Sequence, residues 1–373
     1  MTATGLRAPP EAADRRDDYR AVADRRDDYR AAADRRDDWR AAPDRRDDWR
    51  DDYRAAAMSS ADLLARVGLD AGALAYAIAE TPFPVRVPPH FLSLIRRGDP
   101  FDPLLLQVLA RADELVPTPA TSTDPLGESG FGFGPGILRK YGSRALLLAA
   151  GSCAIHCRYC FRRHTDYGAA MLPAGALADA LAAIAADPGI TEIILSGGDP
   201  LTLSDDRLAA LLTALAALPQ LTGIRLHSRT LTAVPARVTP ALLALLAGLG
   251  KPVVIVLHTN HAQELDPHVG AALARLRGAG VHLLNQSVLL RGINDTPATA
   301  IAHARQLFAC GVLPYYTHLL DPVAGAAHFD VPLTEAMALE AAMRAALPGY
   351  LVPRFVREVP GDVSKTPIWQ LAG

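Results

Sequence analysis

Several features that would point to a common protein class are scarce in this chain of 373 residues. It contains only 4 cysteines, too few for the disulfide framework that holds small secreted domains together. Its formal net charge is −2, which gives no reason to expect a nucleic acid or an anionic membrane as partner. We find no signal peptide and no charge-free apolar run of about 20 residues, so neither secretion nor a membrane span is expected. The sequence therefore favours a cytoplasmic globular protein with one large or two ordinary domains.

The near-zero net charge hides a highly charged repeat at the N-terminus. The segment DRRDDYR begins at Asp14 and recurs with a period of ten residues, with Trp replacing Tyr in later copies. Residues 14–54 hold 14 Asp and 13 Arg, and one aromatic residue per repeat cannot build a core. A period of ten matches neither the seven-residue nor the eleven-residue repeat of coiled coils. We therefore predict a tail over residues 1–57, disordered or loosely helical, with Met58 as a candidate start of the functional chain. The alternatives are a partner-binding arm and a last repeat that forms part of a first helix.

Composition distinguishes two further regions. Residues 58–136 are predicted to form an N-terminal helical region. Its short helices are expected over 59–80 and 103–115, and a loop rich in Pro, Gly, Ser and Thr over 117–136. Residues 137–349 instead alternate apolar runs of strand length with Ala- and Leu-rich helical runs. This alternation predicts parallel strands buried on both faces, in a sheet that is either open or closed toward a barrel.

The alternation of strand and helix occurs six times. The strands are expected over 145–150, 192–195, 223–226, 252–257, 281–290 and 313–320. The helices are expected near 174–186, 205–217, 239–248, 266–278, 296–310 and 334–346. Polar residues gather after these strands, in 153–163, 196–199, 227–229 and 258–261 and at Asp321. Because sites in such folds lie at the carboxyl ends of the strands, we expect the active site at this edge.

Three of the four cysteines follow the first of these strands. Cys153, Cys157 and Cys160 form the pattern C-x3-C-x2-C, a set of soft thiolate ligands on one loop. A zinc site completed by His156 or His164 is one interpretation, although structural zinc normally has four ligands. The other is a [4Fe–4S] cluster, in which three protein ligands leave one iron free to bind something else. The spacing resembles the signature of the radical S-adenosylmethionine (SAM) enzymes, which favours the cluster.

A glycine-rich turn follows the next predicted strand. It reads Ser196-Gly197-Gly198-Asp199, and glycine permits close approach of a ligand to the backbone. On its own, a pair of glycines after a strand is most often a plain turn. In radical SAM enzymes a similar turn offers its backbone to the methionyl amine of SAM, and Tyr159 resembles the aromatic residue that lies beside the adenine. The resemblance therefore implies that these five residues bind SAM.

Longer motifs narrow the resemblance. Residues from about 85 to 370 are similar to the lysine 2,3-aminomutase family, through RKYGSRALLL, CAIHCRYCFRRH, SGGDPL, IRLHSR, LLNQSVLLRGIND, PYYTHLLDPVAGAAHFDV and GYLVPRFVREVPGDVSKTP. Within the family, the motifs most resemble the branch whose product modifies elongation factor P. The resemblance implies a partial (α/β)6 TIM-like radical SAM barrel over 137–349 and a C-terminal cofactor segment over 350–373.

The family also implies a second cofactor, pyridoxal 5′-phosphate (PLP). Lys365 matches the lysine that binds PLP covalently, although its position alone would suggest an exposed tail residue. The PLP phosphate needs cations. Arg144 matches a residue that binds this phosphate, Lys140 stands where an aminomutase carries Arg, and Arg229 is a third candidate. Gln286 matches a glutamine near SAM and PLP.

Three positions match residues that bind the substrate lysine. Arg162 matches the arginine that pairs with the α-carboxylate, which suits the two-pronged guanidinium. Asp321 matches an aspartate that binds the distal ammonium, and Glu358 replaces a second aspartate of the family. Two acids at that end would also disfavour glutamate as a substrate. A surface carboxylate is the alternative for Glu358.

Together these matches predict an isomerase. It would convert L-lysine into (R)-β-lysine with SAM, a [4Fe–4S] cluster and PLP, for post-translational modification of elongation factor P. The expected partners are elongation factor P, its lysyl ligase and an electron donor of the flavodoxin or ferredoxin type, and a homo-oligomer is left open. The alternatives are a free-standing lysine 2,3-aminomutase of lysine metabolism and a non-catalytic, metal-structured α/β protein. Cys310, inside a predicted helix, has no assigned role.

Overall fold

The computed structural model describes residues 48–70, 74, 77, 83–173 and 175–372, which belong to one compact unit that begins at Asp48. This unit starts before the boundary expected after residue 57, because the end of the last repeat and the residues that follow it form helix α2 (Trp49–Ala55). Residues 44–47 of that repeat lie outside the described residues. Asp48 caps the helix by accepting a hydrogen bond from the backbone N–H of Arg50. The last repeat therefore contributes a first helix, as one of the alternatives predicted. The earlier copies lie outside the described residues.

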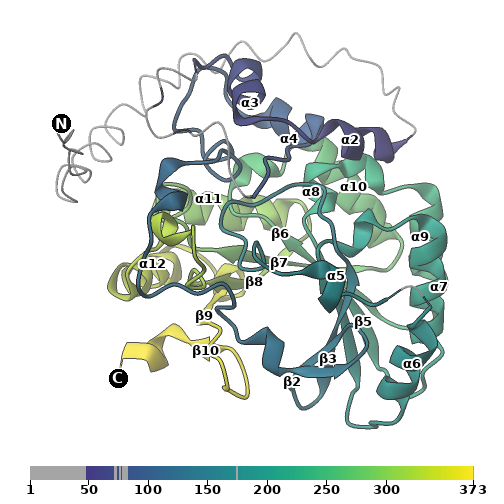
Figure 1. Cartoon of the computed structure of the whole chain (residues 1–373). Helices are drawn as coiled ribbons and strands as arrows, with labels where there is room; N and C mark the ends of the chain where they lie inside the picture. Colours follow the sequence, from purple (N-terminus) through teal and green to yellow (C-terminus); the bar gives the residue numbers. More distant parts are fainter. Residues whose placement is uncertain (1–47, 71–73, 75–76, 78–82, 174, 373) are drawn as a thin grey trace, which may run out of the picture. The chain divides into compact units, whose positions relative to one another are not determined.

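One ten-stranded sheet forms the centre of this unit, and its strands lie side by side in chain order (Figure 1). All neighbours from β3 to β9 are parallel, whereas β1 and β2 form an antiparallel edge on one side and β10 on the other. The six predicted strands are confirmed as β3 to β8, and the short β9 adds a seventh parallel strand. The strands are β1 (Gly132–Gly134), β2 (Ile137–Tyr141), β3 (Arg144–Ala150), β4 (Glu192–Gly197), β5 (Gly223–Ser228), β6 (Val253–His258), β7 (His282–Val288), β8 (Leu313–His318), β9 (Arg354–Arg357) and β10 (Thr366–Pro367).

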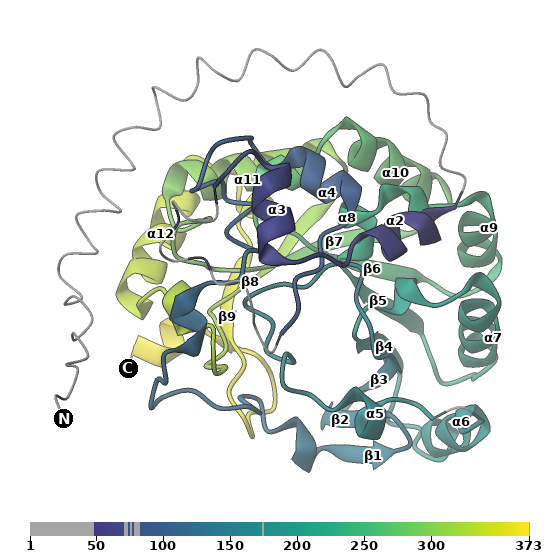
Figure 2. The ribbon, with the colours of Figure 1, turned by 45° about the horizontal axis from the view of Figure 1, so that its top comes forward.

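Six longer helices alternate with the strands and surround the sheet, as Figure 2 shows. They are α6 (Leu177–Ala185), α7 (Asp205–Ala216), α9 (Pro240–Gly248), α10 (Pro267–Gly278), α11 (Pro297–Ala309) and α12 (Leu333–Ala346). All six coincide with predicted helices, so the partial (α/β)6 barrel is confirmed, and its linear strand order leaves the sheet open. The short helices are α3 (Ser60–Arg66), α4 (Pro89–Leu94), α5 (Tyr167–Ala170) and α8 (Thr230–Ala233). The second part of the helical stretch expected over 59–80 falls largely outside the described residues.

The stretch expected to be helical over 103–115 is instead a series of turns that ends in the 3-10 helix η3 (Ala112–Leu115). The Asp102 carboxylate accepts hydrogen bonds from the backbone N–H groups of Leu104 and Leu105, at 2.8 and 3.1 Å. The apolar side chains of this stretch are almost all fully buried rather than confined to one face. Tertiary packing, and not helical periodicity, therefore determines its conformation.

Two hydrophobic clusters position the carboxyl edge of the sheet. The strands β4 and β6 read EIILSG and VVIVLH and are buried along most of their length, as expected for parallel strands covered on both faces. Leucines and isoleucines of the surrounding helices pack against them. A second cluster packs α2, α3 and α4 against Ala154 and Ile155, which lie within the cysteine loop. The N-terminal helices therefore support the loop that carries the cysteines.

The aromatic residue of the last repeat gives a test of where the folded unit begins. Trp49 is only 3% exposed, and the guanidinium of Arg237 lies 4.5 Å from the centre of its ring. We expect Trp49→Ala to lower the free energy of unfolding by about 3 kcal/mol, because a large buried side chain is lost. Denaturant unfolding of the full chain measures this. The control is Trp369→Ala, whose side chain is 62% exposed and whose replacement should change stability little.

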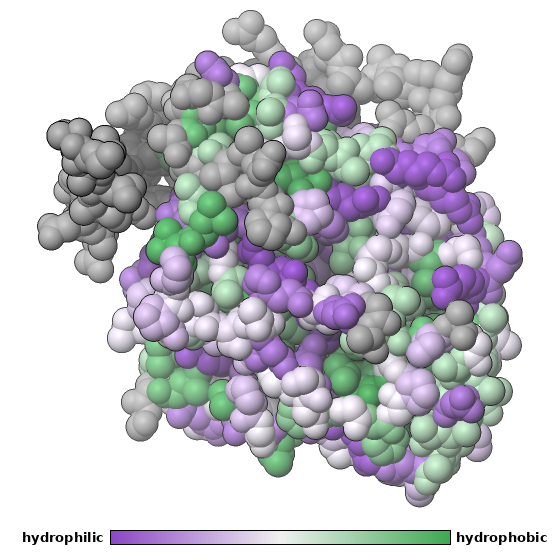
Figure 3. Space-filling model, in the orientation of Figure 1, coloured by the Kyte–Doolittle hydropathy of each residue, from purple (hydrophilic) through white to green (hydrophobic). Residues whose placement is uncertain are grey.

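The surface is mixed in polarity. On the face drawn in Figure 3, hydrophobic and hydrophilic residues are interspersed, and no large continuous hydrophobic area stands out. Among the described residues, no helix has the length and apolarity needed to span a membrane.

Candidate active site

Side chains from separate strands converge where the sequence predicted a site. Burial, followed by the charges of Arg225, Lys365 and Arg162, lowers the pKa of His227, although these residues come from different segments. Burial lowers the pKa of His258 to about 3, and burial also holds the pKa values of His227 and His318 well below the ordinary value. These histidines are therefore neutral at pH 7, and the charge of the site comes from its arginines, lysines and carboxylates.

The cysteine loop, residues 151–166, is held in place by a buried ion triad. Glu114 of η3 accepts hydrogen bonds from Arg158, at 2.8 Å, and from Arg163, at 2.5 Å. These two arginines flank Cys160 in the sequence. Arg158 also donates to the carbonyl oxygen of Phe83, at 2.7 Å. Because breaking a buried pair leaves an uncompensated charge, this triad fixes the loop against the N-terminal region.

The two histidines considered for a zinc site are engaged elsewhere. His156 Nδ1 lies 2.8 Å from the carbonyl oxygen of Pro84, and His164 Nε2 lies 3.0 Å from that of Ala324. One ring nitrogen of each histidine is thus bonded to the backbone of a segment outside the cysteine loop.

The three thiols fit the donor set of an iron–sulfur cluster. Burial raises the pKa of Cys153 well above its usual range, and the charges of Asp199, Cys160 and Cys157 raise it further. Burial, followed by Cys157, raises the pKa of Cys160 to about 11. All three thiols come from one loop, and each cysteine is only partly exposed. Three soft sulfur donors on one loop form a set that iron favours.

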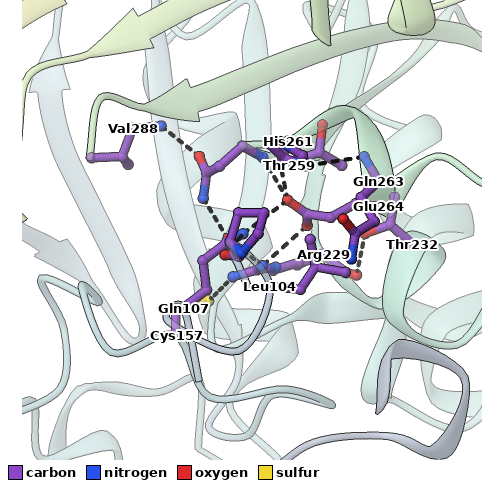
Figure 4. Close-up of polar contacts among 12 residues, drawn as sticks. Leu104, Gln107, Cys157, Arg229, Thr232, Thr259, His261, Gln263, Glu264 and Val288 are labelled. Carbon is purple, nitrogen blue, oxygen red and sulfur yellow. Dashed lines mark hydrogen bonds and ion pairs between the residues drawn. The ribbon is translucent and has the colours of Figure 1, made fainter. Parts of the chain in front are cut away.

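Arg229 provides a cation on this side of the site (Figure 4). Its Nη1 donates to Cys157 Sγ at 2.7 Å and also bonds to the Tyr159 hydroxyl. Its Nη2 donates to Gln107 Oε1 at 2.7 Å and to Glu264 Oε2 at 3.0 Å. The expected role of Arg229 in holding the PLP phosphate is therefore not supported, because its guanidinium is engaged beside the cysteines. Gln107 and Glu264 were missed from the sequence, since neither lies in a recognisable motif.

Close backbone contacts within the chain require glycine at both Gly197 and Gly198. A Cβ atom on Gly198 would lie 2.3 Å from the carbonyl oxygen of Ser152, and one on Gly197, whose φ is +105°, would lie 2.6 Å from that of Ala150. Only glycine permits this contact between the ends of β3 and β4. The turn therefore brings backbone groups up to the cysteine loop, as SAM binding requires.

The side chain of Asp199, which follows the glycines, connects two strand ends. Its Oδ2 accepts hydrogen bonds from the backbone N–H groups of Arg229 and Thr230, at 2.7 and 2.8 Å, and from Ser228 Oγ at 3.0 Å. Its Oδ1 accepts from the backbone N–H of Leu201, at 3.0 Å. Both carboxylate oxygens are thus used in joining the ends of β4 and β5, so any contact of Asp199 with SAM would be made by its backbone, which stays a prediction.

Arg162 is held by a carboxylate that sequence reasoning missed. Its Nε and Nη2 donate to the two carboxylate oxygens of Glu128, at 2.7 and 2.8 Å. Its Nη1 donates to Ser196 Oγ at 3.0 Å, so Ser196 orients the arginine. Glu128 lies in the Gly- and Pro-rich loop over 117–136, and its charge in a region of low charge was the only available signal.

Lys365 and Lys140 share one carboxylate. Lys365 Nζ donates to Glu358 Oε2 at 2.6 Å, and Lys140 Nζ donates to Glu358 Oε1 at 2.9 Å. Pairing of Thr366 with Arg357 in the β9–β10 hairpin brings Lys365 opposite Glu358. Burial disfavours the ionised form of Glu358, yet the two lysines hold its pKa far below its usual range. Lys140, expected near the PLP phosphate, therefore pairs with Glu358, which is a candidate for binding the substrate. Because Glu358 binds two lysines, it is not a free surface carboxylate.

The remaining cofactor candidates lie on the same side. The guanidinium of Arg144 lies 4.2 Å from the centre of the Tyr141 ring. Burial raises the pKa of Tyr141, and the charge of Glu358 raises it further, which connects Arg144 with the Lys365 end of the site. Gln286 Nε2 lies 3.5 Å from His227 Nδ1. A cation, a reactive amine and aromatic rings in one place fit the phosphate and ring of PLP.

Asp321 has a buried carboxylate oxygen that no side chain of the site binds. Its Oδ1 has no hydrogen-bond partner among the residues that the structure describes. Burial, followed by the negative charge of Glu358, raises the pKa of Asp321 to about 7. A buried carboxylate without a partner is costly, and a ligand ammonium would compensate it. Asp321 therefore fits the expected role in binding the distal ammonium of a substrate.

Asp321→Asn should separate function from stability. A carboxyl whose pKa is raised from 3.8 in the unfolded chain to about 7 in the folded one destabilises the fold as pH rises through that interval. The variant should therefore be more stable than the wild type by about 4 kcal/mol at pH 8. At pH 4 the difference should nearly vanish, because the carboxyl is then protonated in the folded state and only partly ionised in the unfolded state. Its KM for lysine should rise by roughly tenfold or more, because one charge partner is lost. Urea unfolding at the two pH values and initial rates measure both effects; greater stability of the wild type at pH 8 would refute the assignment.

Comparison with known proteins agrees with this geometry. A model of the Radical SAM superfamily matches residues 149–304, which contain the cysteine loop and the glycine turn. The chain is 44% identical to the L-lysine 2,3-aminomutase of Escherichia coli, over 82% of this chain and 90% of that protein. It is 43% identical to that of Haemophilus influenzae, over 76% of this chain and 84% of that protein. Identity to that of Clostridium subterminale is 35%, over 76% of this chain and 68% of that protein. The superfamily implies SAM and a [4Fe–4S] cluster. This chain belongs to the L-lysine 2,3-aminomutase family of radical SAM enzymes.

Proposed function

We propose that this chain converts L-lysine into β-lysine, with PLP bound covalently to Lys365. The observation that supports this most is the convergence of Lys365, Glu358 and the unpaired Asp321 carboxylate beside the cysteine loop. Lys365 Nζ lies 2.6 Å from Glu358 Oε2, and the charge of Lys365 acts on Asp321. An amine next to two acids is suited to a substrate that itself carries two ammonium groups.

The protein holds its cofactors on two sides of the site. When bound, the cluster and SAM would supply the radical chemistry and PLP would supply the attachment for the migrating amino group. Cys153, Cys157 and Cys160 would hold three irons, and Arg229 would balance the negative charge of the thiolates. Lys365 and Arg144 would hold PLP.

The substrate would be recognised at both of its ends. Arg162 would bind the α-carboxylate, while Asp321 and Glu358 would bind the distal ammonium. The neutral histidines His227 and His258 add no competing positive charge. Glutamate would bring a carboxylate toward the two acids and is expected to be excluded.

We further propose that the product is (R)-β-lysine and that a lysyl ligase attaches it to elongation factor P. This proposal rests on the motifs that resemble the corresponding branch of the family. We expect a cytoplasmic reaction with a reductant of the flavodoxin or ferredoxin type.

Product analysis tests the finer proposal. The product of the reconstituted protein is separated on a chiral column and then offered, with ATP, to a lysyl ligase and elongation factor P. We expect the (R) enantiomer and a mass increase on the factor. The (S) enantiomer without transfer would instead favour a free-standing aminomutase of lysine metabolism.

A further inference from the structure

We infer that Glu128 is a displaceable internal ligand of Arg162, which the α-carboxylate of the substrate must replace before it can bind. This inference rests on the proposed function, in which Arg162 recognises that carboxylate. It assigns Glu128 as a residue that sets substrate affinity and specificity.

The first step is the occupancy of the Arg162 guanidinium. One edge, formed by Nε and Nη2, donates to both oxygens of Glu128, at 2.7 and 2.8 Å. The other side is engaged through Nη1, which donates to Ser196 Oγ at 3.0 Å and to the carbonyl oxygen of Gly197 at 3.3 Å. A guanidinium binds a carboxylate best through two parallel N–H groups. A substrate carboxylate can therefore bind in this way only at the edge that Glu128 occupies.

The second step is the charge of Glu128. Its side chain is largely buried, and burial alone would raise its pKa, but Arg162 and then Lys140 keep the pKa below its usual range. Glu128 is therefore an anion, as the α-carboxylate of lysine is. Lys140 Nζ lies 3.6 Å from Glu128 Oε1 and offers a second partner when Arg162 is taken.

The third step is the arrangement of the whole row of charges. Arg162, Glu128, Lys140, Glu358 and Lys365 alternate in sign, and each neighbouring pair lies within 4.0 Å. Lysine carries a carboxylate at one end and an ammonium at the other. It can exchange with Glu128 on Arg162 and with a lysine on Glu358 without changing the charge balance. Within the chain, Arg162 thus already binds a carboxylate and Glu358 already binds ammonium groups, as each would bind the corresponding group of the substrate.

The segment that carries Glu128 is suited to such an exchange. Glu128 begins the three-residue 3-10 helix η4 (Glu128–Gly130). It follows Gly127, whose φ of 61° is a left-handed conformation that glycine adopts readily. The backbone N–H of Glu128 donates to Asp124 Oδ1 at 2.9 Å. A short helix anchored by a local cap can shift without disturbing the strands of the barrel.

Binding to a Glu128→Gln variant tests the inference. Glutamine keeps the shape of the side chain but removes its charge, so it competes less well for Arg162. Calorimetry on the full chain loaded with PLP gives Kd for L-lysine and for cadaverine, which lacks the carboxylate. We expect the Kd of L-lysine to fall by roughly 3–10-fold, the difference between a charge-assisted and a neutral hydrogen bond, and that of cadaverine to stay unchanged.

Controls separate the possible outcomes. Glu335→Gln removes an exposed carboxylate of α12 that pairs with Arg291, in the turn after β7, and should change neither Kd. If the Gln variant melts early, Glu128→Asp keeps the charge, shortens the reach and should lower the Kd of L-lysine by a smaller factor. An unchanged or higher Kd for L-lysine, or an equal change for cadaverine, would overturn the inference. If the wild-type protein forms β-lysine, such a result rejects only the role inferred for Glu128. If the wild-type protein forms no β-lysine, the proposed function itself is rejected.

Discussion

Cys157→Ala should prevent cluster assembly and lower the rate of β-lysine formation by at least about 10³-fold. Three thiolates are the fewest that hold the cluster while leaving one iron free, so the loss of one leaves an incomplete set. Without the reduced cluster, the radical that starts the reaction cannot be formed, and most of the rate acceleration of the enzyme is lost. Iron and sulfide per chain after anaerobic reconstitution, together with turnover, measure the effect.

The fourth cysteine is the matched control for this prediction. Cys310 is the C-cap of α11, and its nearest side-chain partner is Gln306 Nε2 at 4.0 Å. Cys310→Ala should bind iron and turn over as the wild type does. Full iron content and activity in Cys157→Ala, or loss of iron in Cys310→Ala, would show that the cluster is held elsewhere.

Lys365→Ala should abolish covalent PLP binding and lower activity by at least about 10³-fold, because no other group can take over the attachment in the same geometry. The chain has only three lysines, which are Lys140, Lys251 and Lys365. Borohydride reduction of the PLP-loaded protein, followed by mass mapping of its peptides, therefore has few possible outcomes. We expect the label on Lys365, and the absorbance of bound PLP should be absent in the variant.

Lys251 serves as the control for this second prediction. Its Nζ donates to the carbonyl oxygens of Leu218 and Leu221 at the opposite ends of the strands, at 2.8 and 2.5 Å. Lys251→Ala should keep the PLP absorbance and the label. A label on Lys140, which lies against the same Glu358 carboxylate, would reassign the attachment site.

The sequence predicts those parts of the structure that depend on local pattern. Alternating apolar strands and amphipathic helices located β3 to β8 and their six helices, and the cysteine spacing located the loop. The helix expected over 103–115 is wrong because Asp102 binds the backbone N–H groups at its start. Almost all apolar side chains of this stretch are also buried, rather than those of one face alone. The short β9 also escaped prediction, since four residues carry little periodic signal.

Side-chain partners in the site were harder to predict than its location. Arg229 and Asp199 lie in motifs that resemble the family, yet their hydrogen bonds assign them to the cysteine side and to the joining of two strand ends. Glu128 lies in a loop, where its partner Arg162 is 34 residues away in sequence. Such pairs depend on how distant segments pack, and residue spacing does not encode this.

Conversion of L-lysine by the wild-type protein tests the central claim most directly. The full chain is incubated without oxygen with iron, sulfide, PLP, SAM, dithionite and L-lysine, and the amino acids are then separated by chromatography. We predict that β-lysine forms, and that omission of PLP or SAM prevents it. Complete recovery of L-lysine from a protein that holds its cluster and its PLP would contradict the proposed function.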